Sequence, residues 1–128
     1  MSDFKVLIDS HVLVWLLYEP DKVSTETKNL LQEADVVYLS SVSLWELALK
    51  FNKHKLAYSP KELIAGAKEL NLERLSLRDQ HILLLESIKL SHKDPFDYLL
   101  VAQSEAEGSI FVTADSRILD SGYHTFEC

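Results

Sequence analysis

The sequence has few cysteines, glycines and prolines, the residues that form disulfides in small secreted proteins and flexible linkers between domains. Its one cysteine, Cys128, cannot form an internal disulfide or a thiolate metal site. Three glycines and three prolines leave no flexible linker and no glycine-rich phosphate loop. No apolar run approaches the length of a membrane span, and no secretory signal is visible at the N-terminus. We expect a cytoplasmic protein without a membrane segment, forming a single domain over residues 1–128.

Positive charge is also scarce. The 13 lysines and arginines face 20 aspartates and glutamates, which gives a formal net charge of −7. Proteins that hold nucleic acid through its phosphates alone are usually basic, so this composition argues against a simple electrostatic DNA binder. The acidic excess is explained either by solubility or by carboxylates gathered around a cation, which would reverse the local charge.

Short apolar runs alternate with helical patterns along the whole chain. Strands are predicted at 4–8, 36–39 and 110–113, with weaker signals at 72–77 and 123–126. Helices are predicted over 11–18, 24–34, 43–53, 60–71, 78–88 and 95–108, with capping boxes at Ser43–Glu46 and Ser59–Glu62. Strands separated by helices need crossover connections, so the predicted fold class is α/β, with a mainly parallel sheet covered on both faces.

Four acidic residues fall where such a sheet would bring them together. Asp9 and Asp115 directly follow apolar strands, and Glu46 and Asp97 lie in the first turns of predicted helices. The carboxyl ends of parallel strands share one edge of the sheet, so these side chains are expected to be neighbours. Four like charges in one cleft are unfavourable unless protons or a cation offset them.

The expected cation is Mg²⁺, with Mn²⁺ as a substitute. Both ions take carboxylate and water oxygens, whereas zinc would more often have histidine or cysteine ligands. Such an ion can activate a water molecule and offset charge on a phosphoryl oxygen. In a chain without a phosphate-cradling loop, this favours hydrolysis of a phosphodiester over nucleoside triphosphate chemistry.

Each acid taken alone also has a purely structural explanation. Glu46 matches the capping box of Ser43, and Asp97 stands three residues after a helix cap at Asp94. Asp9 and Asp115 are ordinary turn residues after strands. The occurrence of all four at one sheet edge favours a functional site.

Four segments resemble, in order and spacing, the PIN-domain ribonucleases, and most closely the VapC-type toxins of type II toxin–antitoxin pairs. They are LIDSHVLVWL, SSVSLWELALK, HKDPFDYLLVAQSEAEG and IFVTAD. The resemblance covers essentially the whole chain. It implies a three-layer α/β/α sandwich, Mg²⁺- or Mn²⁺-dependent endonuclease activity on RNA, and inhibition by a small antitoxin protein. Family members commonly form dimers, so a homodimer is also expected.

The resemblance also implies roles for individual residues. Asp9, Glu46, Asp97 and Asp115 match the family's catalytic, metal-binding acidic residues. Asp94, Thr113 and Ser10 are expected around them. Asp94 would cap the helix and orient Asp97, and Thr113 would hold a water of the ion. Tyr98 stands where relatives often have arginine, which removes one phosphate contact. For RNA contacts we consider His92, Lys93 and Lys50, and we assign Trp15 and Trp45 to core packing or a dimer surface.

Two other functions remain open from the sequence. The chain could be a receiver-like phosphotransfer domain, in which an aspartate at a strand end is phosphorylated. That class usually needs a partner lysine after a late strand, and none is evident. Alternatively, it could be a catalytically silent module that binds a protein partner and uses the acids only as helix caps and solvent-facing charges.

Overall fold

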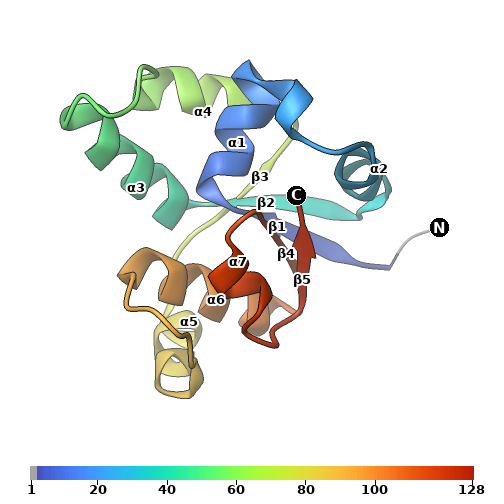
Figure 1. The fold of residues 1–128 in the computed structure, drawn as a ribbon, viewed down its shortest axis with the longest axis vertical. Helices are drawn as coiled ribbons and strands as arrows, with labels where there is room; N and C mark the ends of the chain where they lie inside the picture. The colour runs from blue at the N-terminus through green and yellow to red at the C-terminus, as the bar shows by residue number, and fades with distance from the viewer. Residues whose placement is uncertain (1–2) are drawn as a thin grey trace.

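The computed structural model describes residues 3–128 and contains one five-stranded sheet (Figure 1). The strand order is β3-β2-β1-β4-β5, and all four pairings are parallel. The strands are β1 Lys5–Ile8, β2 Val36–Ser40, β3 Glu73–Leu75, β4 Ile110–Thr113 and β5 Thr125–Glu127. The predicted α/β class is confirmed, and β1 lies at the centre of the sheet.

Helices cover both faces of this sheet, which makes three layers (Figure 1). The α-helices are α1 Ser10–Tyr18, α2 Thr25–Glu33, α3 Ser41–Asn52, α4 Pro60–Glu69, α5 Asp79–Leu83, α6 Pro95–Glu107 and α7 Ser116–Leu119. Two short 3-10 helices, η1 Pro20–Lys22 and η2 Leu84–Ser87, complete the fold. Within residues 3–128, no helix combines the length and apolar character that a membrane span requires.

The side chains of β1 alternate between two hydrophobic cores. Val6 and Ile8 face the core formed with α1, α3 and α4, whereas Leu7 faces the core formed with α6 and α7. All three side chains are fully buried. Because strands point successive side chains to opposite faces, a continuous apolar run is what a sheet covered on both sides requires.

Two predicted helices begin or end differently in the structure. The helix predicted from Ser43 starts at Ser41, because β2 runs to Ser40 and the Ser40 hydroxyl accepts the Val42 N–H as the N-cap. The helix predicted over 78–88 divides into α5 and η2, and η2 ends at Ser87 because the chain becomes extended at the buried Ile88. The capping box at Ser59 is confirmed.

Candidate active site

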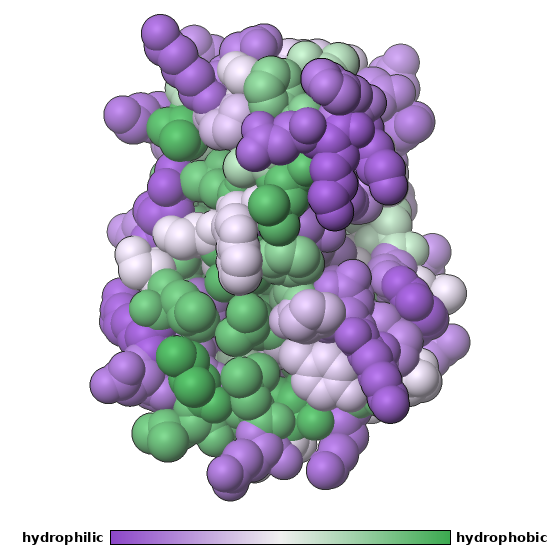
Figure 2. All heavy atoms as spheres, turned by 90° about the vertical axis from the view of Figure 1, so that its left-hand side faces the viewer, coloured by the Kyte–Doolittle hydropathy of each residue, from purple (hydrophilic) through white to green (hydrophobic). Residues whose placement is uncertain are grey.

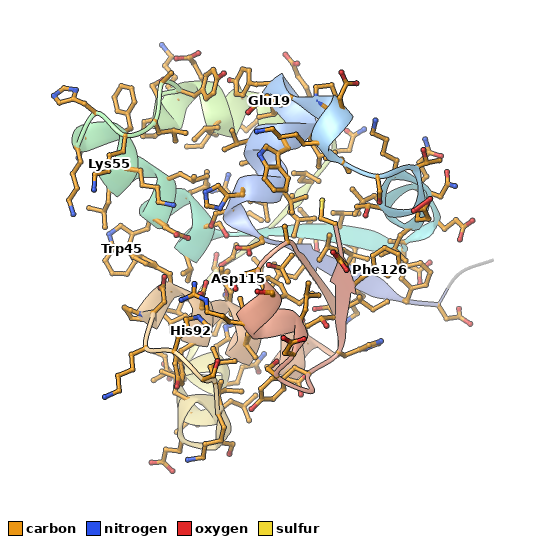
Figure 3. All side chains as sticks on the ribbon, viewed as in Figure 1. Glu19, Trp45, Lys55, His92, Asp115 and Phe126 are labelled. Atoms are coloured by element: carbon orange, nitrogen blue, oxygen red, sulfur yellow. The ribbon has the colours of Figure 1, made fainter. Side chains whose placement is uncertain are left out.

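A cleft of about 420 Å³ opens beside the carboxyl ends of β1, β2 and β4. All four acids predicted from the sequence line it, and they come from four different elements. Its acidic lining residues are Asp9, Glu46, Asp94, Asp97 and Asp115. In Figure 3, the labelled Asp115 and His92 lie near one another below α1 and α3, which agrees with the short distance between their ligand atoms. The parallel topology therefore brings the acids together as expected.

Asp9 is a buried acid whose two carboxylate oxygens both accept hydrogen bonds. It is the N-cap of α1, and its Oδ1 accepts the N–H of Ser10 at 2.7 Å. Its Oδ2 accepts the hydroxyl of Thr113 at 2.6 Å. Burial raises the pKa of Asp9, although these hydrogen bonds to the carboxylate oppose the shift. The negative charge of Asp9 is therefore unfavourable at this position, and a bound cation would offset it.

Glu46 is oriented by side chains from two directions. The Ser10 hydroxyl donates to its Oε1 at 2.6 Å, and Lys50 Nζ lies 3.5 Å from its Oε2, one helical turn further along α3. Because Ser10 directly follows Asp9, the same backbone junction fixes both acids. The predicted position of Ser10 beside the acids is thus observed.

The structural explanation of Glu46 as the end of a capping box is wrong. Since α3 begins at Ser41, Glu46 lies in its second turn, beyond the reach of the cap. The Ser43 hydroxyl is buried and makes no hydrogen bond within residues 3–128. A helix cap does not account for Glu46 in this cleft.

Asp94 and Asp97 have different partners at the start of α6. Asp94 is the N-cap, and its Oδ1 accepts the N–H groups of Phe96 at 2.9 Å and Asp97 at 3.3 Å, as predicted. The Asp97 side chain instead forms a hydrogen bond with His92, whose Nε2 lies 2.7 Å from Asp97 Oδ2. Burial raises the pKa of Asp97 to about 6, with the negative charges of Asp94 and Asp9 adding to the shift and His92 opposing it.

Asp115 differs from Asp9 and Asp97 because it has an arginine partner. It caps α7, and both of its oxygens accept hydrogen bonds from the Arg117 guanidinium, at 3.1 and 2.9 Å. These hydrogen bonds lower the pKa of Asp115. Arg117 also lines the cleft, so one cation of the chain already faces the carboxylates.

Thr113 connects two of the acids through its side chain. Its buried hydroxyl donates to Asp9 and accepts the N–H of Asp115 at 3.1 Å. These two hydrogen bonds fix the end of β4 against the end of β1. The hydroxyl oxygen keeps a second lone pair, so its contact with a water of the ion stays a prediction.

The three residues proposed for RNA contacts lie in different surroundings. Lys50 lines the cleft, where it pairs with Glu46. His92 is half-buried and turned toward Asp97. Lys93 is exposed and does not line the cleft. The structure thus gathers Lys50 and His92 at the site and leaves Lys93 outside it.

The sequence also predicts His11 beside the cleft, and the structure confirms this position, but sequence reasoning missed Trp15 and Arg117. His11 and Trp15 line the cleft from α1, and Arg117 lines it from α7. Trp15 lies four residues after His11 on a helix that begins next to Asp9, and this spacing is a signal that could have identified it. The position of Arg117, two residues after Asp115, is a similar signal.

The residues present fit a divalent metal ion. One ligand atom each from His92, Asp97 and Asp115 lies within 4.8 Å of the others. Asp9 and Glu46 face the same cleft but do not belong to this tightest group. Carboxylate oxygens dominate the donor set, which suits Mg²⁺ or Mn²⁺. Burial raises the pKa of both Asp9 and Asp97, so a bound cation would favour their charged forms.

Comparison with known proteins places the geometry in a family. The PIN-domain family model matches residues 6–121. No curated protein matches the chain in sequence. Among solved structures, VapBC2 from Rickettsia felis bound to a promoter DNA fragment is similar with 12% identity and a TM-score of 0.72, covering 97% of this chain and 98% of that one. DNA-bound VapBC from Salmonella typhimurium has 19% identity and a TM-score of 0.71, covering 98% of each chain.

Proposed function

The chain belongs to the PIN-domain family, and on that premise we propose that it is a Mg²⁺-dependent endoribonuclease, with Mn²⁺ as a substitute. Its substrate is RNA, and the bond it hydrolyses is the phosphodiester. The observation that carries the proposal is the convergence of Asp9, Glu46, Asp97 and Asp115 on one cleft from four separate elements.

Each side chain has a distinct part in this proposal. Asp97 and Asp115 hold the ion, and Asp9 and Glu46 complete its acidic surroundings. When bound, the divalent ion supplies charge neutralisation at the phosphate and activates water for attack. His92 holds Asp97 in position, and Ser10 and Thr113 do the same for Glu46 and Asp9. Lys50 and Arg117 line the cleft as cations that can approach a phosphate oxygen.

The test is cleavage of single-stranded RNA by the purified protein. We expect cleavage with Mg²⁺ or Mn²⁺, none with EDTA, and a loss of at least a hundredfold in Asp97→Asn. Asp120→Asn makes the same charge change at an exposed position outside the cleft lining and should cleave normally. Undiminished cleavage by Asp97→Asn would reject the assignment of the site. Absence of Mg²⁺ binding in calorimetry would reject metal dependence and favour a binding module.

The proposal extends to a toxin role with an antitoxin partner. The proposal is supported by the similar structures from Rickettsia felis and Salmonella typhimurium, which are VapBC complexes with the same fold. A small antitoxin would silence the enzyme by covering the acidic cleft. Growth arrest on expression of the wild-type chain, relieved by Asp97→Asn, is the expected result. Normal growth with wild-type protein present would contradict the toxin role.

We also propose a homodimer. Figure 2 shows apolar side chains gathered on the lower part of one face, at the level of α5. Within α5, Ile82 is 49% exposed and Leu83 is 76% exposed, which is unusual for large aliphatic side chains. Light scattering should give twice the mass of the 14.6 kDa chain, and Leu83→Lys should halve it. A monomeric wild-type protein would contradict this arrangement.

A further inference from the structure

The acidic cleft has an aromatic wall that the metal chemistry does not use. His11 and Trp15 line it, one turn apart on α1, with ring centroids 6.2 Å apart and planes inclined by 38°. Since α1 begins right after Asp9 and rises 1.5 Å per residue, the backbone of Trp15 lies about 9 Å along the helix axis from that of Asp9. A nucleotide held at the acids can extend its base over this distance.

Trp15 is not a core residue. On the same helix, Val12, Leu13 and Val14 are buried in the core beside the sheet. Trp15 is only partly buried, and neither hydrophobic core of residues 3–128 includes it. His11 is exposed. An indole placed at a cleft rather than in the core, with its ring partly open to solvent, is available to a ligand.

One cation lies against the Trp15 ring and two others line the same cleft. Lys22 Nζ lies 5.8 Å from the centre of the Trp15 ring and pairs with Glu19 at 3.2 Å. Lys50 and Arg117 line the cleft on other elements. Aromatic rings interleaved with cations are how proteins bind single-stranded nucleic acid, because every base has a face that can stack and every nucleotide has a phosphate.

We propose that Trp15 and His11 form a stacking platform for one base of single-stranded RNA next to the bond that is cut. This inference rests on the proposed function and extends it to the form of the substrate. Paired bases in a duplex do not expose their faces, so the platform selects unpaired segments such as loops and ends. It also supplies affinity that the acidic surface cannot, since stacking tolerates any base.

The fluorescence of Trp15 tests the platform directly. The chain has two tryptophans, so Trp45→Phe leaves Trp15 as the only one. With Ca²⁺ in place of Mg²⁺, a single-stranded RNA octamer should quench this fluorescence. A duplex of the same sequence, or an octamer lacking its bases, should quench it much less. Equal quenching by the abasic octamer, or no quenching by an RNA whose binding is seen by anisotropy, would overturn the proposal.

Steady-state kinetics of Trp15 variants provide a second test of the stacking platform. Trp15→Leu should raise KM for single-stranded RNA about tenfold or more, while kcat changes little. Trp15→Phe keeps an aromatic ring, so its KM should rise less than that of Trp15→Leu. Trp45→Leu is the matched control, because Trp45 is 55% exposed and lies outside the cleft lining. If wild-type protein cleaves RNA and Trp15→Leu has an unchanged KM, the platform is wrong and the nuclease stands. If wild-type protein cleaves no RNA, the proposed function itself fails.

Discussion

The two carboxylates nearest the proposed ion are held in opposite ways. Asp97 is buried beside other acids and its pKa is raised to about 6, whereas Asp115 shares two hydrogen bonds with Arg117 and its pKa is lowered. One site thus contains an acid whose charge is unfavourable and an acid whose charge is already neutralised. The ion proposed here would relieve the first and compete with Arg117 for the second.

Replacement of Arg117 should therefore tighten metal binding. Arg117→Gln removes the competing guanidinium, and since the pair is half-exposed, we expect Mg²⁺ affinity to rise about two- to fivefold. Isothermal titration calorimetry measures this change. Arg74→Gln removes the same charge from an exposed position on β3 and is the control. Weaker Mg²⁺ binding by Arg117→Gln would show that the arginine organises Asp115 for the ion rather than competing for it.

Among the elements, Thr113 joins the ends of two neighbouring strands through a side chain. Thr113→Val keeps the shape but leaves a buried Asp9 oxygen and the Asp115 N–H without this partner. Loss of a buried hydrogen bond of this kind costs about 1–3 kcal/mol. Urea denaturation should show that loss in the free energy of unfolding.

The matched variant is Thr113→Ser, which retains the hydroxyl and should recover most of the stability. If Thr113→Ser is as unstable as Thr113→Val, the methyl group rather than the hydrogen bond accounts for the effect.

A buried histidine joins α5 to α6. His81 is fully buried, its Nδ1 accepts the Arg78 N–H at 2.9 Å, and its Nε2 lies 3.0 Å from Glu107 Oε2. The hydrogen bond from His81 lowers the pKa of Glu107. A carboxyl whose folded pKa is depressed adds stability above its unfolded pKa, and this stability is lost as pH falls through the folded value.

Glu107→Gln should lower the free energy of unfolding by about 1 kcal/mol at pH 7. The difference from wild type should shrink as the pH is lowered below the unfolded pKa of the carboxyl. Denaturation curves at pH 7 and in acid measure both quantities. Glu105→Gln changes an exposed carboxyl on the same helix and should behave as wild type at both pH values. A pH-independent difference for Glu107→Gln would argue against an ionised Glu107 that accepts the hydrogen bond of His81.

The order of the elements could be predicted because it depends on local patterns. The start of α3 could not. Ser40, Ser41 and Ser43 can each cap a helix, and the choice depends on how far β2 continues. Pairing of Ser40 with Leu75 on β3 extends that strand and makes Ser40 the cap. The deciding contact lies 35 residues away, beyond any local window.

The same distinction applies to the site. The positions of Asp9 and Asp115 follow from the parallel topology, because an acid after a strand must lie at the carboxyl edge. The Ser10–Glu46 hydrogen bond and the orientation of Trp15 toward the cleft depend on how α1 packs against α3. Helical periodicity alone is typical of core packing for Trp15, and only the observed arrangement shows it at the cleft.

For the whole molecule, the net charge of −7 should make RNA binding depend on divalent ions. Without them, the acidic cleft repels phosphates; with them, its local charge is reversed. We expect anisotropy titrations with labelled single-stranded RNA to show at least tenfold tighter binding in Ca²⁺ than in EDTA. For Asp97→Asn, the increase in RNA affinity from EDTA to Ca²⁺ should be smaller than for wild type. RNA binding that is equally tight in EDTA would mean that the cations of the chain suffice.

The acids lie at junctions with almost no loop. β1 ends at Ile8 and α1 begins at Ser10, β2 passes directly into α3, and two residues separate β4 from α7. Asp9 and Asp115 therefore sit on the residues that join a strand to the next helix, and Glu46 lies one turn into α3. Because no long loop carries these three acids, we expect the proposed activity to be controlled by a partner that occupies the mouth of the cleft rather than by movement of a lid.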